Sequence, residues 1–485
     1  MLKRLVIVIF IMFGAFLTFS LYRTFAYDTS VVEEVPSTTD LEYTFKIGNS
    51  SIKQITVDSG ETRYYDIVLG NPNNAKISYS VYYEMVSPSS KPDDYKIEYT
   101  SKSTGESTGI VNNNGNITLN IVVTNTSSNA VTVKVGTVAG YVKGGELTLN
   151  SGQEVIPKKV FPKATYVVEH LDDGTTGDSG SGVYKIEHSA IPAESSATGS
   201  EIPAVTDYRY YGSSPNNYIC LDMEDSSTCP GKHLYRIIGS IYEELEDANR
   251  LKVIMATPLT DGITNEFSWD YTSSGSYSNI WATPTNGNYS NSLTSGSQLM
   301  KLLNSGAWWN GTSGSYYNES TTATNVDFTN ELSDKAKSYI TTSRYYLGGL
   351  YIEGVMTNQF YNYERGTNRY DTNRPLYWDG YVGLMYPSDY GYMSGNACTT
   401  GTGLNDYMGE CSNKAWSLND SNYHWLMMPV SRSDGTVFYI DNAGMIDNGF
   451  GSNNTLSVSP TFYLSSATSI TSGDGTSSNP YQITK

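Results

Sequence analysis

Histidine and cysteine are scarce in this sequence, with four residues of each among 485. Common catalytic and phosphate-binding patterns are missing too. There is no His-Glu-x-x-His, no Gly-x-Ser-x-Gly, no phosphate loop and no dinucleotide-binding fingerprint. Acidic residues outnumber basic ones by 49 to 31, and the resulting net charge of −18 repels phosphate backbones, so we expect no nucleic-acid partner. These absences favour a non-catalytic protein with no cofactor and no metal site.

One long apolar run is present, close to the N-terminus. Lys3 and Arg4 precede the uncharged residues 5–22, which would span about 27 Å as a helix. Cleaved signal peptides usually have a shorter apolar stretch, of about 7 to 15 residues, so this length favours a retained anchor. The two cations favour a cytoplasmic N-terminus. We predict a signal or anchor helix over residues 1–26 and a single-pass membrane protein with an extracellular C-terminal portion. The alternative is a secreted protein, cleaved after Ala26.

The four cysteines form two pairs that are close in sequence, Cys220 with Cys229 and Cys398 with Cys411. An even, locally paired set in an exported chain predicts two structural disulfides. A redox or metal site is the alternative, but neither pair has the C-x-x-C spacing.

An acidic, polar stem at residues 27–41 is followed by a long region of short alternating segments. Residues 42–150 place apolar or aromatic side chains at every second position, between turn clusters of Gly, Asn, Asp, Ser and Pro. Eight strands without a helical stretch predict an antiparallel, immunoglobulin-like β-sandwich. We expect these strands at residues 42–47, 53–57, 64–69, 76–83, 95–99, 116–124, 130–135 and 142–149.

The composition changes after residue 150. Residues 151–205 are rich in Gly, Ser, Asp and other small residues, which predicts a connector with some ordered structure. Beyond it, residues 206–485 are expected to form an α+β domain that is mostly strands and loops. Strands are predicted at residues 234–241 and 251–256. Two short helices are predicted as well, one capped by Ser295 and the other by Asn330.

A series of motifs in this last region resembles a known module. In order, they are Tyr208–Leu221, Leu234–Gly239, Phe267–Asp270, Leu299–Asn304 with Trp308-Trp309, Tyr345–Gly349, Tyr363–Gly366, Trp378–Tyr392, Trp425–Ser431, Pro460–Ser465 and Ile470–Ile483. As an ordered set over residues 205–485 they resemble an uncharacterised exported surface-protein module of anaerobic Gram-positive bacteria. That resemblance implies a location at the cell surface and a shared architecture, but no particular chemistry.

A second similarity is to the C-type-lectin-like fold, including its formylglycine-generating-enzyme branch. The segment Gly383–Tyr390 is similar to the Leu-Pro-(Ser/Thr)-Asp/Glu stretch of that branch. The active-site cysteines of that enzyme have no match here, and the Glu-Pro-Asn calcium motif of the lectins is missing. The similarity therefore implies a fold, without formylglycine chemistry or calcium-dependent sugar binding.

Aromatic residues next to amides are the best candidates for ligand contacts. Flat rings provide contact area at a low entropic cost, and amides form hydrogen bonds with hydroxyls, so such loops suit glycans or protein partners. The alternative is that these rings fill the core, as we expect of Trp378, Trp416 and Trp425. The candidates are Trp308, Trp309, Asn310, Tyr316, Tyr317, Tyr361 and Tyr363.

These observations predict a membrane-anchored extracellular surface protein that is not an enzyme and functions in adhesion or in binding a glycan or surface-protein ligand. A first alternative is a structural subunit of a surface filament or matrix, assembled through strand edges. A second alternative is an extracellular hydrolase or modifying enzyme.

Overall fold

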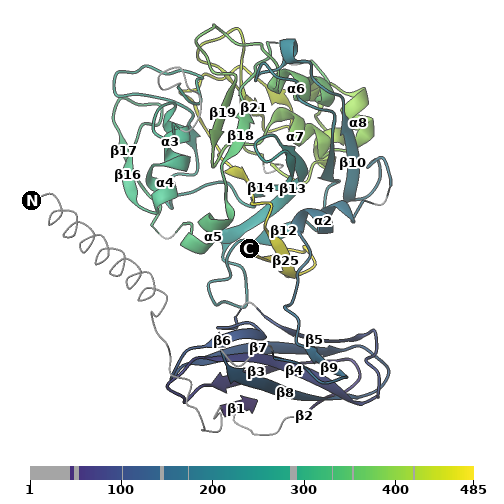
Figure 1. The fold of residues 1–485 in the computed structure, drawn as a ribbon. Helices are drawn as coiled ribbons and strands as arrows, with labels where there is room; N and C mark the ends of the chain where they lie inside the picture. The colour runs from purple at the N-terminus through teal and green to yellow at the C-terminus, as the bar shows by residue number, and fades with distance from the viewer. Residues whose placement is uncertain are drawn as a thin grey trace, which may run out of the picture. The chain divides into compact units, whose positions relative to one another are not determined.

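The computed structural model describes residues 44–47, 54–100, 102–142, 147–172, 174–283, 292–329, 331–351, 354–418 and 421–485. They form two compact units, one ending at Val160 and the other beginning at Phe161. The protein is rich in β-structure, with several antiparallel sheets and short helices (Figure 1). None of the described helices is both long and apolar enough to cross a membrane. The predicted anchor (residues 1–26) and stem (residues 27–41) lie outside the described residues.

The first unit contains two antiparallel sheets. One has the strand order β1-β3-β7-β5, and the other has the order β2-β8-β4-β6, with β9 paired to β4. Side chains from both sheets form a single apolar core. In β5, for example, the alternate residues Tyr95, Ile97 and Tyr99 are buried. The strands are β1 (Thr44–Ile47), β2 (Gln54–Val57), β3 (Glu61–Gly70), β4 (Ile77–Ser87), β5 (Tyr95–Tyr99), β6 (Thr108–Val111), β7 (Asn116–Asn125), β8 (Val131–Tyr141) and β9 (Gln153–Val155).

Seven of the eight strands predicted in this region are present. The eighth was predicted at residues 142–149, of which residues 143–146 lie outside the described residues. Strand β8 ends at Tyr141, and residues 142 and 147–150 form no strand. The alternation after residue 130 belongs to one long strand, which pairs with β4 along nearly its whole length. Strands β6 and β9 were not predicted from the sequence.

The second unit is built around an eight-stranded sheet. Its main path is β10-β11-β13-β12-β26-β25, and β14 pairs with both β13 and β24. The pair β12–β26 is parallel, and the other pairs in this sheet are antiparallel. The strands are β10 (Gly182–His188), β11 (Val205–Tyr211), β12 (Tyr218–Cys220), β13 (Leu234–Glu243), β14 (Ala248–Met255), β24 (Thr461–Tyr463), β25 (Ser469–Ser472) and β26 (Tyr481–Thr484). Strands β13 and β14 confirm the predicted pair.

Smaller sheets complete this unit. They are formed by β15 (Phe267–Ser268) with β23 (Thr455–Leu456), β16 (Ser313–Tyr316) with β17 (Thr324–Asp327), β18 (Ser343–Tyr346) with β19 (Tyr377–Gly380), and β20 (His424–Pro429) with β21 (Val437–Ile440) and β22 (Ile446–Asp447). Part of the segment predicted as a connector contributes α2 and β10 to this unit.

The described residues contain more helices than the two that were predicted. They are α2 (Ala164–Glu169), α3 (Gln298–Asn304), α4 (Ala307–Asn310), α5 (Asp334–Tyr339), α6 (Thr357–Glu364), α7 (Pro387–Tyr392), α8 (Asn396–Gly401) and α9 (Glu410–Lys414), with 3-10 turns η1 (Ala193–Ser195), η2 (Gly231–His233) and η3 (Leu404–Asp406). The two predicted helices are α3 and α5, but their predicted caps are wrong. Ser297 caps α3, because its hydroxyl accepts a hydrogen bond from the backbone N–H of Met300. Ser333 caps α5 in the same way, by accepting from the backbone N–H of Ala336.

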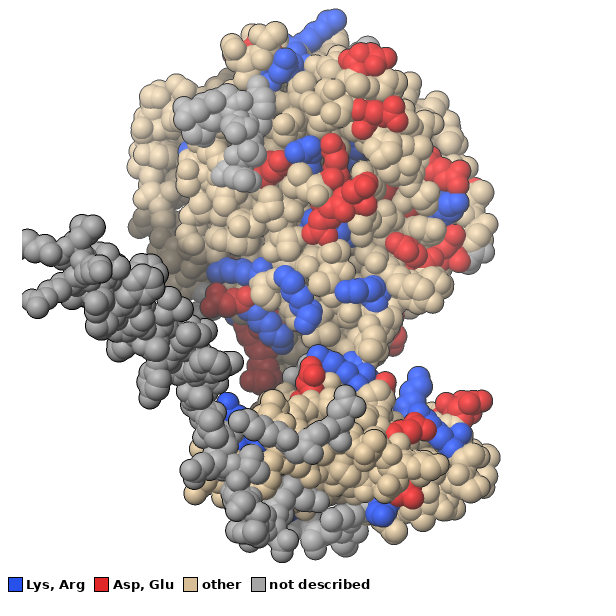
Figure 2. Space-filling model, viewed as in Figure 1, with Lys and Arg blue, Asp and Glu red and all other residues tan. Residues whose placement is uncertain are grey.

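Both predicted disulfides are present, Cys220–Cys229 and Cys398–Cys411, with Cα–Cα distances of 5.9 and 5.8 Å. Disulfides of this kind indicate an oxidising location outside the cytoplasm. On the face of the second unit drawn in Figure 2, charged side chains lie in small groups of both signs between large uncharged areas.

Candidate ligand-binding site

The predicted ligand-binding residues fall into two groups on opposite sides of the second unit. Five of them lie on or next to α4 and β16, and two lie on α6 (Figure 1). In the first group Trp308 and Tyr316 are buried, as part of the main apolar core. Tyr317 is half-buried. Buried rings contribute packing energy and offer no surface to a ligand, so Trp308 and Tyr316 act as core residues.

Trp309 and Asn310 are the accessible members of that group, but both have partners within the protein. The Trp309 ring is half-buried and stacks on Tyr381, with ring centroids 5.1 Å apart. Asn310 is exposed, and its amide donates a 2.7 Å hydrogen bond to the carbonyl of Ser305. Neither residue lines any of the hollows described below.

In the second group, Tyr363 lines a hollow of about 390 Å³ next to the C-terminal end of α6. Its walls come from two stretches far apart in sequence, the segment after β10 and the end of α6 with the loop that follows it. The lining residues are Ser189, Ala190, Ile191, Pro192, Ser195, Asn362, Tyr363, Gly366, Thr367 and Asn368. We call this the α6 hollow. Its volume is within the range of about 300 to 1,000 Å³ that is typical of small-ligand sites.

The chemistry of the α6 hollow is polar but uncharged. Hydroxyl groups come from Ser189, Ser195 and Thr367, and carboxamides come from Asn362 and Asn368. None of the lining residues is ionisable at neutral pH. Such a site can exchange hydrogen bonds with hydroxyl and amide groups, and it provides no counter-ion for a charged ligand.

The segment after β10 is held in place by its own small core. Ile191 and Ile202 form an isolated antiparallel bridge, and both belong to an apolar cluster with Ala197 and Tyr346. The Ala197 N–H also donates a 2.7 Å hydrogen bond to the Arg365 carbonyl at the end of α6. This wall of the hollow is therefore fixed directly to the opposite wall.

The α6 wall is held by close backbone packing. The N–H of Gly348 donates to the Glu364 carbonyl at 3.0 Å, and the N–H of Gly349 donates to the Asn368 carbonyl at 2.8 Å. A Cβ atom at Gly348 would lie 2.4 Å from the Tyr363 carbonyl oxygen, which is closer than any real contact. Position 348 therefore requires glycine.

Tyr361, the residue before Asn362 in α6, is buried and does not line the hollow. One face of its buried ring stacks on His188, with centroids 3.7 Å apart and an interplanar angle of 6°. The Arg365 guanidinium lies over the Tyr361 ring at 3.5 Å. Burial raises the pKa of Tyr361 to about 12, against the opposing charge of Arg365.

A buried ion network continues from His188 into the core. His188 lies 3.0 Å from the Asp207 carboxylate, which also accepts hydrogen bonds from the Arg209 guanidinium. Arg209 reaches Asp389 at 2.7 Å, and Lys252 reaches the other oxygen of Asp389 at 2.6 Å. All five side chains are buried. We call this set of five residues the ion network.

The electrostatics of the ion network follow from its pairing. Burial would raise the pKa of Asp389, but the charges of Lys252 and Arg209 outweigh it and lower the pKa to about 2. Asp207 has its pKa lowered for the same kind of reason, since Arg209 and His188 oppose the effect of burial. Burial lowers the pKa of His188 despite the neighbouring Asp207. Both carboxylates are therefore ionised at neutral pH.

Glu364 at the end of α6 lies against this network. Its carboxylate accepts hydrogen bonds from the Ser388 amide at 2.9 Å and the Ser388 hydroxyl at 2.6 Å, and from Arg365 at 3.1 Å. Burial nevertheless raises the pKa of Glu364 to about 7. Ser388 and Asp389 are adjacent residues of α7. The hydrogen bonds of Glu364 with Ser388 therefore connect the end of α6 to α7 and, through Asp389, to the ion network.

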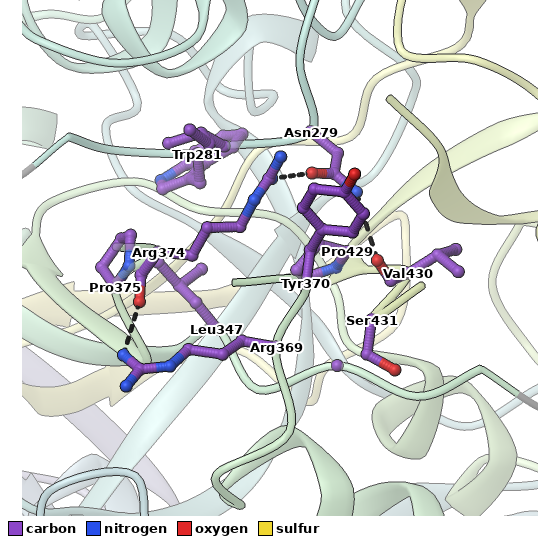
Figure 3. Close-up of a pocket in the computed structure, with 12 residues that line it drawn as sticks. Asn279, Trp281, Leu347, Arg369, Tyr370, Arg374, Pro375, Pro429, Val430 and Ser431 are labelled. Carbon is purple, nitrogen blue, oxygen red and sulfur yellow. Dashed lines mark hydrogen bonds between the residues drawn. The ribbon is translucent and has the colours of Figure 1, made fainter. Parts of the chain in front are cut away.

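A second cavity in this unit is lined by Arg374, Asn279, Trp281 and nine neighbouring residues (Figure 3). The Arg374 guanidinium donates hydrogen bonds to the Asn279 side chain and to the Asp434 carbonyl. The cavity has a volume of only about 20 Å³, which is room for roughly one water molecule. It is too small to be the principal ligand site.

Nine of the ten residues that line the α6 hollow are not among the seven candidates. Five of the nine have polar side chains: Ser189, Ser195, Asn362, Thr367 and Asn368. Serine, threonine and asparagine are abundant throughout the chain, so single residues of these types carried no signal. Their shared site arises from the tertiary packing of segments about 170 residues apart. Of the predicted residues, only Tyr363 lines the hollow.

Among the described residues no group of three or more His, Cys, Asp or Glu side chains is arranged to hold a metal ion. Comparison with known proteins adds no assignment: no protein-family model matches the chain, and no curated protein matches it. The α6 hollow is therefore interpreted from its geometry and chemistry.

Proposed function

We propose that this protein is a membrane-anchored, extracellular binding protein that recognises a neutral glycan at the α6 hollow. One observation carries the proposal: a ligand-sized hollow whose walls expose hydroxyls, carboxamides and a tyrosine but no charged side chain. Sugars present dense arrays of hydroxyl groups that both donate and accept, and these are the partners that Ser, Thr and Asn side chains match.

The rigidity of the hollow also supports binding. Its two walls are joined by the Ala197–Arg365 hydrogen bond, and the ring of Tyr361, next to Asn362 in α6, is held between His188 and Arg365. A preformed site loses little conformational entropy when a ligand binds, and this favours affinity.

The location is proposed from the sequence together with the disulfides. The two bonded cysteine pairs fit an oxidising exterior. The apolar run at residues 5–22 would anchor the chain in a membrane with the C-terminal portion outside. The resemblance to exported surface-protein modules predicts the same location.

We also propose an architecture for the exposed portion. The first unit would be an immunoglobulin-like sandwich that acts as a stalk, in keeping with its two antiparallel sheets and single core. The second unit would be a relative of the C-type-lectin-like fold that presents the α6 hollow to its ligand.

A glycan array with the full chain in detergent tests the proposal. The matched variants are Asn362→Ala with Asn368→Ala, which removes two exposed carboxamides from the hollow, and Asn310→Ala, which removes an exposed carboxamide on the opposite side. At about 1 kcal/mol for each lost hydrogen bond, the double variant should bind neutral glycans about 10-fold to 30-fold more weakly.

The Asn310→Ala control should bind like the unaltered protein. Two results would contradict the proposal: a folded protein that binds no neutral glycan, or glycan binding that Asn310→Ala abolishes and the double variant leaves intact.

A further inference from the structure

A second hollow, of about 340 Å³, is lined by other residues of β10 and α6. It is bordered by β10, by the N-terminal part of α6, by α8 and by the segment before β10. Its polar lining includes Thr175, Thr176, Asn358, Asn396 and Thr400. We call it the β10 hollow. None of these residues was predicted from the sequence.

The two hollows share the same supporting elements. Along β10 and its extension, Lys185, Ile186 and Glu187 line the β10 hollow, and Ser189 lines the α6 hollow. The step from Lys185 to Ser189 is about 13 Å for four residues of extended chain. The strand therefore passes directly from one hollow to the other.

Helix α6 repeats this arrangement on the other side. Asn358 lines the β10 hollow, and Asn362 lines the α6 hollow. Residues four apart occupy the same face of a helix, one above the other, so the two carboxamides are neighbours on one face. Strand and helix together place the hollows end to end.

The point where the hollows meet is firmly built. His188, between the two lining stretches of the strand segment, is buried and stacks on Tyr361, between the two asparagines of the helix. This contact joins the strand to the helix at the boundary of the two hollows, so their spacing is fixed.

The chemistry of the β10 hollow matches that of the α6 hollow. Hydroxyls and carboxamides again provide the polar lining. Its two charged side chains, Lys185 and Glu187, form an ion pair with each other at 2.5 Å, so the charge they present is balanced. Neither hollow offers an uncompensated charge to a ligand.

We propose that the α6 and β10 hollows are consecutive subsites for one linear, neutral oligosaccharide. This inference rests on the proposed function, and it adds that the ligand is a chain of several sugars and not a single terminal sugar. Each hollow would hold a different part of the chain, with the His188–Tyr361 contact between them.

The test is a calorimetric titration of the full chain with neutral oligosaccharides of one to six sugars. Cello- and chito-oligosaccharides are titrated first, followed by the neutral series that gives the strongest array signal. The β10 hollow is altered with Asn358→Ala and Asn396→Ala, the α6 hollow with Asn362→Ala and Asn368→Ala, and Asn310→Ala is the control.

If the hollows are subsites of one ligand, affinity should rise at least about 10-fold from the shortest to the longest oligosaccharide. The affinity for the longest oligosaccharide should fall about 10-fold in either double variant, whereas the affinity for the shortest should fall in only one of the two variants.

The outcomes separate this inference from the proposed function. Oligosaccharides that bind with no gain over length, or long ones that the β10-hollow variant leaves unaffected, would overturn the two-subsite arrangement and leave the α6 hollow as the glycan site. If no neutral oligosaccharide binds, both the two-subsite arrangement and the proposed function are overturned. The same holds if the protein binds extended peptides and no neutral oligosaccharide.

Discussion

Replacing Arg209 with methionine should destabilise the second unit strongly. The Arg209 side chain is 1% exposed, and its guanidinium bonds two carboxylates, with contacts of 2.8 Å to Asp207 and 2.7 Å to Asp389. Methionine fills much of the same volume but provides no charge and no donor. Asp207 and Asp389 would remain buried with only part of their compensation, from His188 and Lys252.

The size of the destabilisation follows from the buried carboxylates that lose the Arg209 charge. Removing one partner of a buried ion pair typically costs about 3 to 5 kcal/mol, because the remaining charge stays desolvated. That is a large part of the roughly 5 to 15 kcal/mol that stabilises a domain. Adding Asp207→Asn to Arg209→Met removes one of the stranded charges and should recover roughly 1 kcal/mol. The control is Lys414→Met, which breaks the more exposed ion pair with Glu410 and should cost less than about 1 kcal/mol.

The assay is guanidinium unfolding followed by tryptophan fluorescence. All seven tryptophans lie between residues 269 and 425, so their fluorescence reports on the second unit and is silent for the first. This isolates one transition in a chain of two units. A loss of stability for Arg209→Met no larger than that for Lys414→Met would refute the argument that the ion network holds this unit together.

Three further predictions concern stability. The pKa of Asp389 is about 2 in the folded protein and near 4 when unfolded, so its ionised form contributes about 2 to 3 kcal/mol to the free energy of unfolding. This contribution is complete above pH 4 and is lost as the pH falls toward 2. The same fluorescence assay from pH 5 to pH 2 should show the loss, and an Asp389→Asn variant should show a weaker acid dependence. Replacing Cys398 and Cys411 with serine opens a loop with a sequence separation of 13 and should cost about 3 kcal/mol in guanidinium unfolding, and an unchanged midpoint would contradict a stabilising role for this bond. Trp308→Ala should cost about 3 to 5 kcal/mol because the ring is fully buried, whereas Trp309→Ala should cost clearly less; equal losses would contradict their placement in the core and at its edge.

Strand alternation carried most of the predictable information about the fold. Strand β5 was predicted at its observed bounds, since its aromatic and β-branched residues occupy every second position. Alternation does not reveal where one long strand ends. The pattern continues beyond Tyr141, but the described residues 142 and 147–149 form no strand.

Short helices were the weakest part of the prediction. Helix α7 contains Pro387 and Gly391, which are poor helix formers in general. Proline is tolerated there because it occupies the first turn, and the Asp389 carboxylate accepts a 3.1 Å hydrogen bond from the Tyr386 amide at the start of the helix. The same carboxylate is fixed by Arg209 and Lys252, so tertiary contacts specify the helix.

The candidate site was predictable only in part. The combination of rings and carboxamides pointed to the end of α6, where Tyr363 lines the hollow. This combination of residue types does not distinguish an exposed ring that lines a site from a buried one. Tyr361 is buried because its ring packs against His188, a contact that the sequence does not reveal. The opposite wall, from Ser189 to Ser195, comes from a distant segment, and residue type alone gave it no signal.

A crystal structure of the full chain soaked with the tightest-binding neutral oligosaccharide would show where the ligand binds. We expect sugar density between residues 189–195 and 362–368, with hydroxyls of the sugar within hydrogen-bonding distance of the Asn362 and Asn368 carboxamides. Density over Trp309 and Tyr381 with the α6 hollow empty would contradict it.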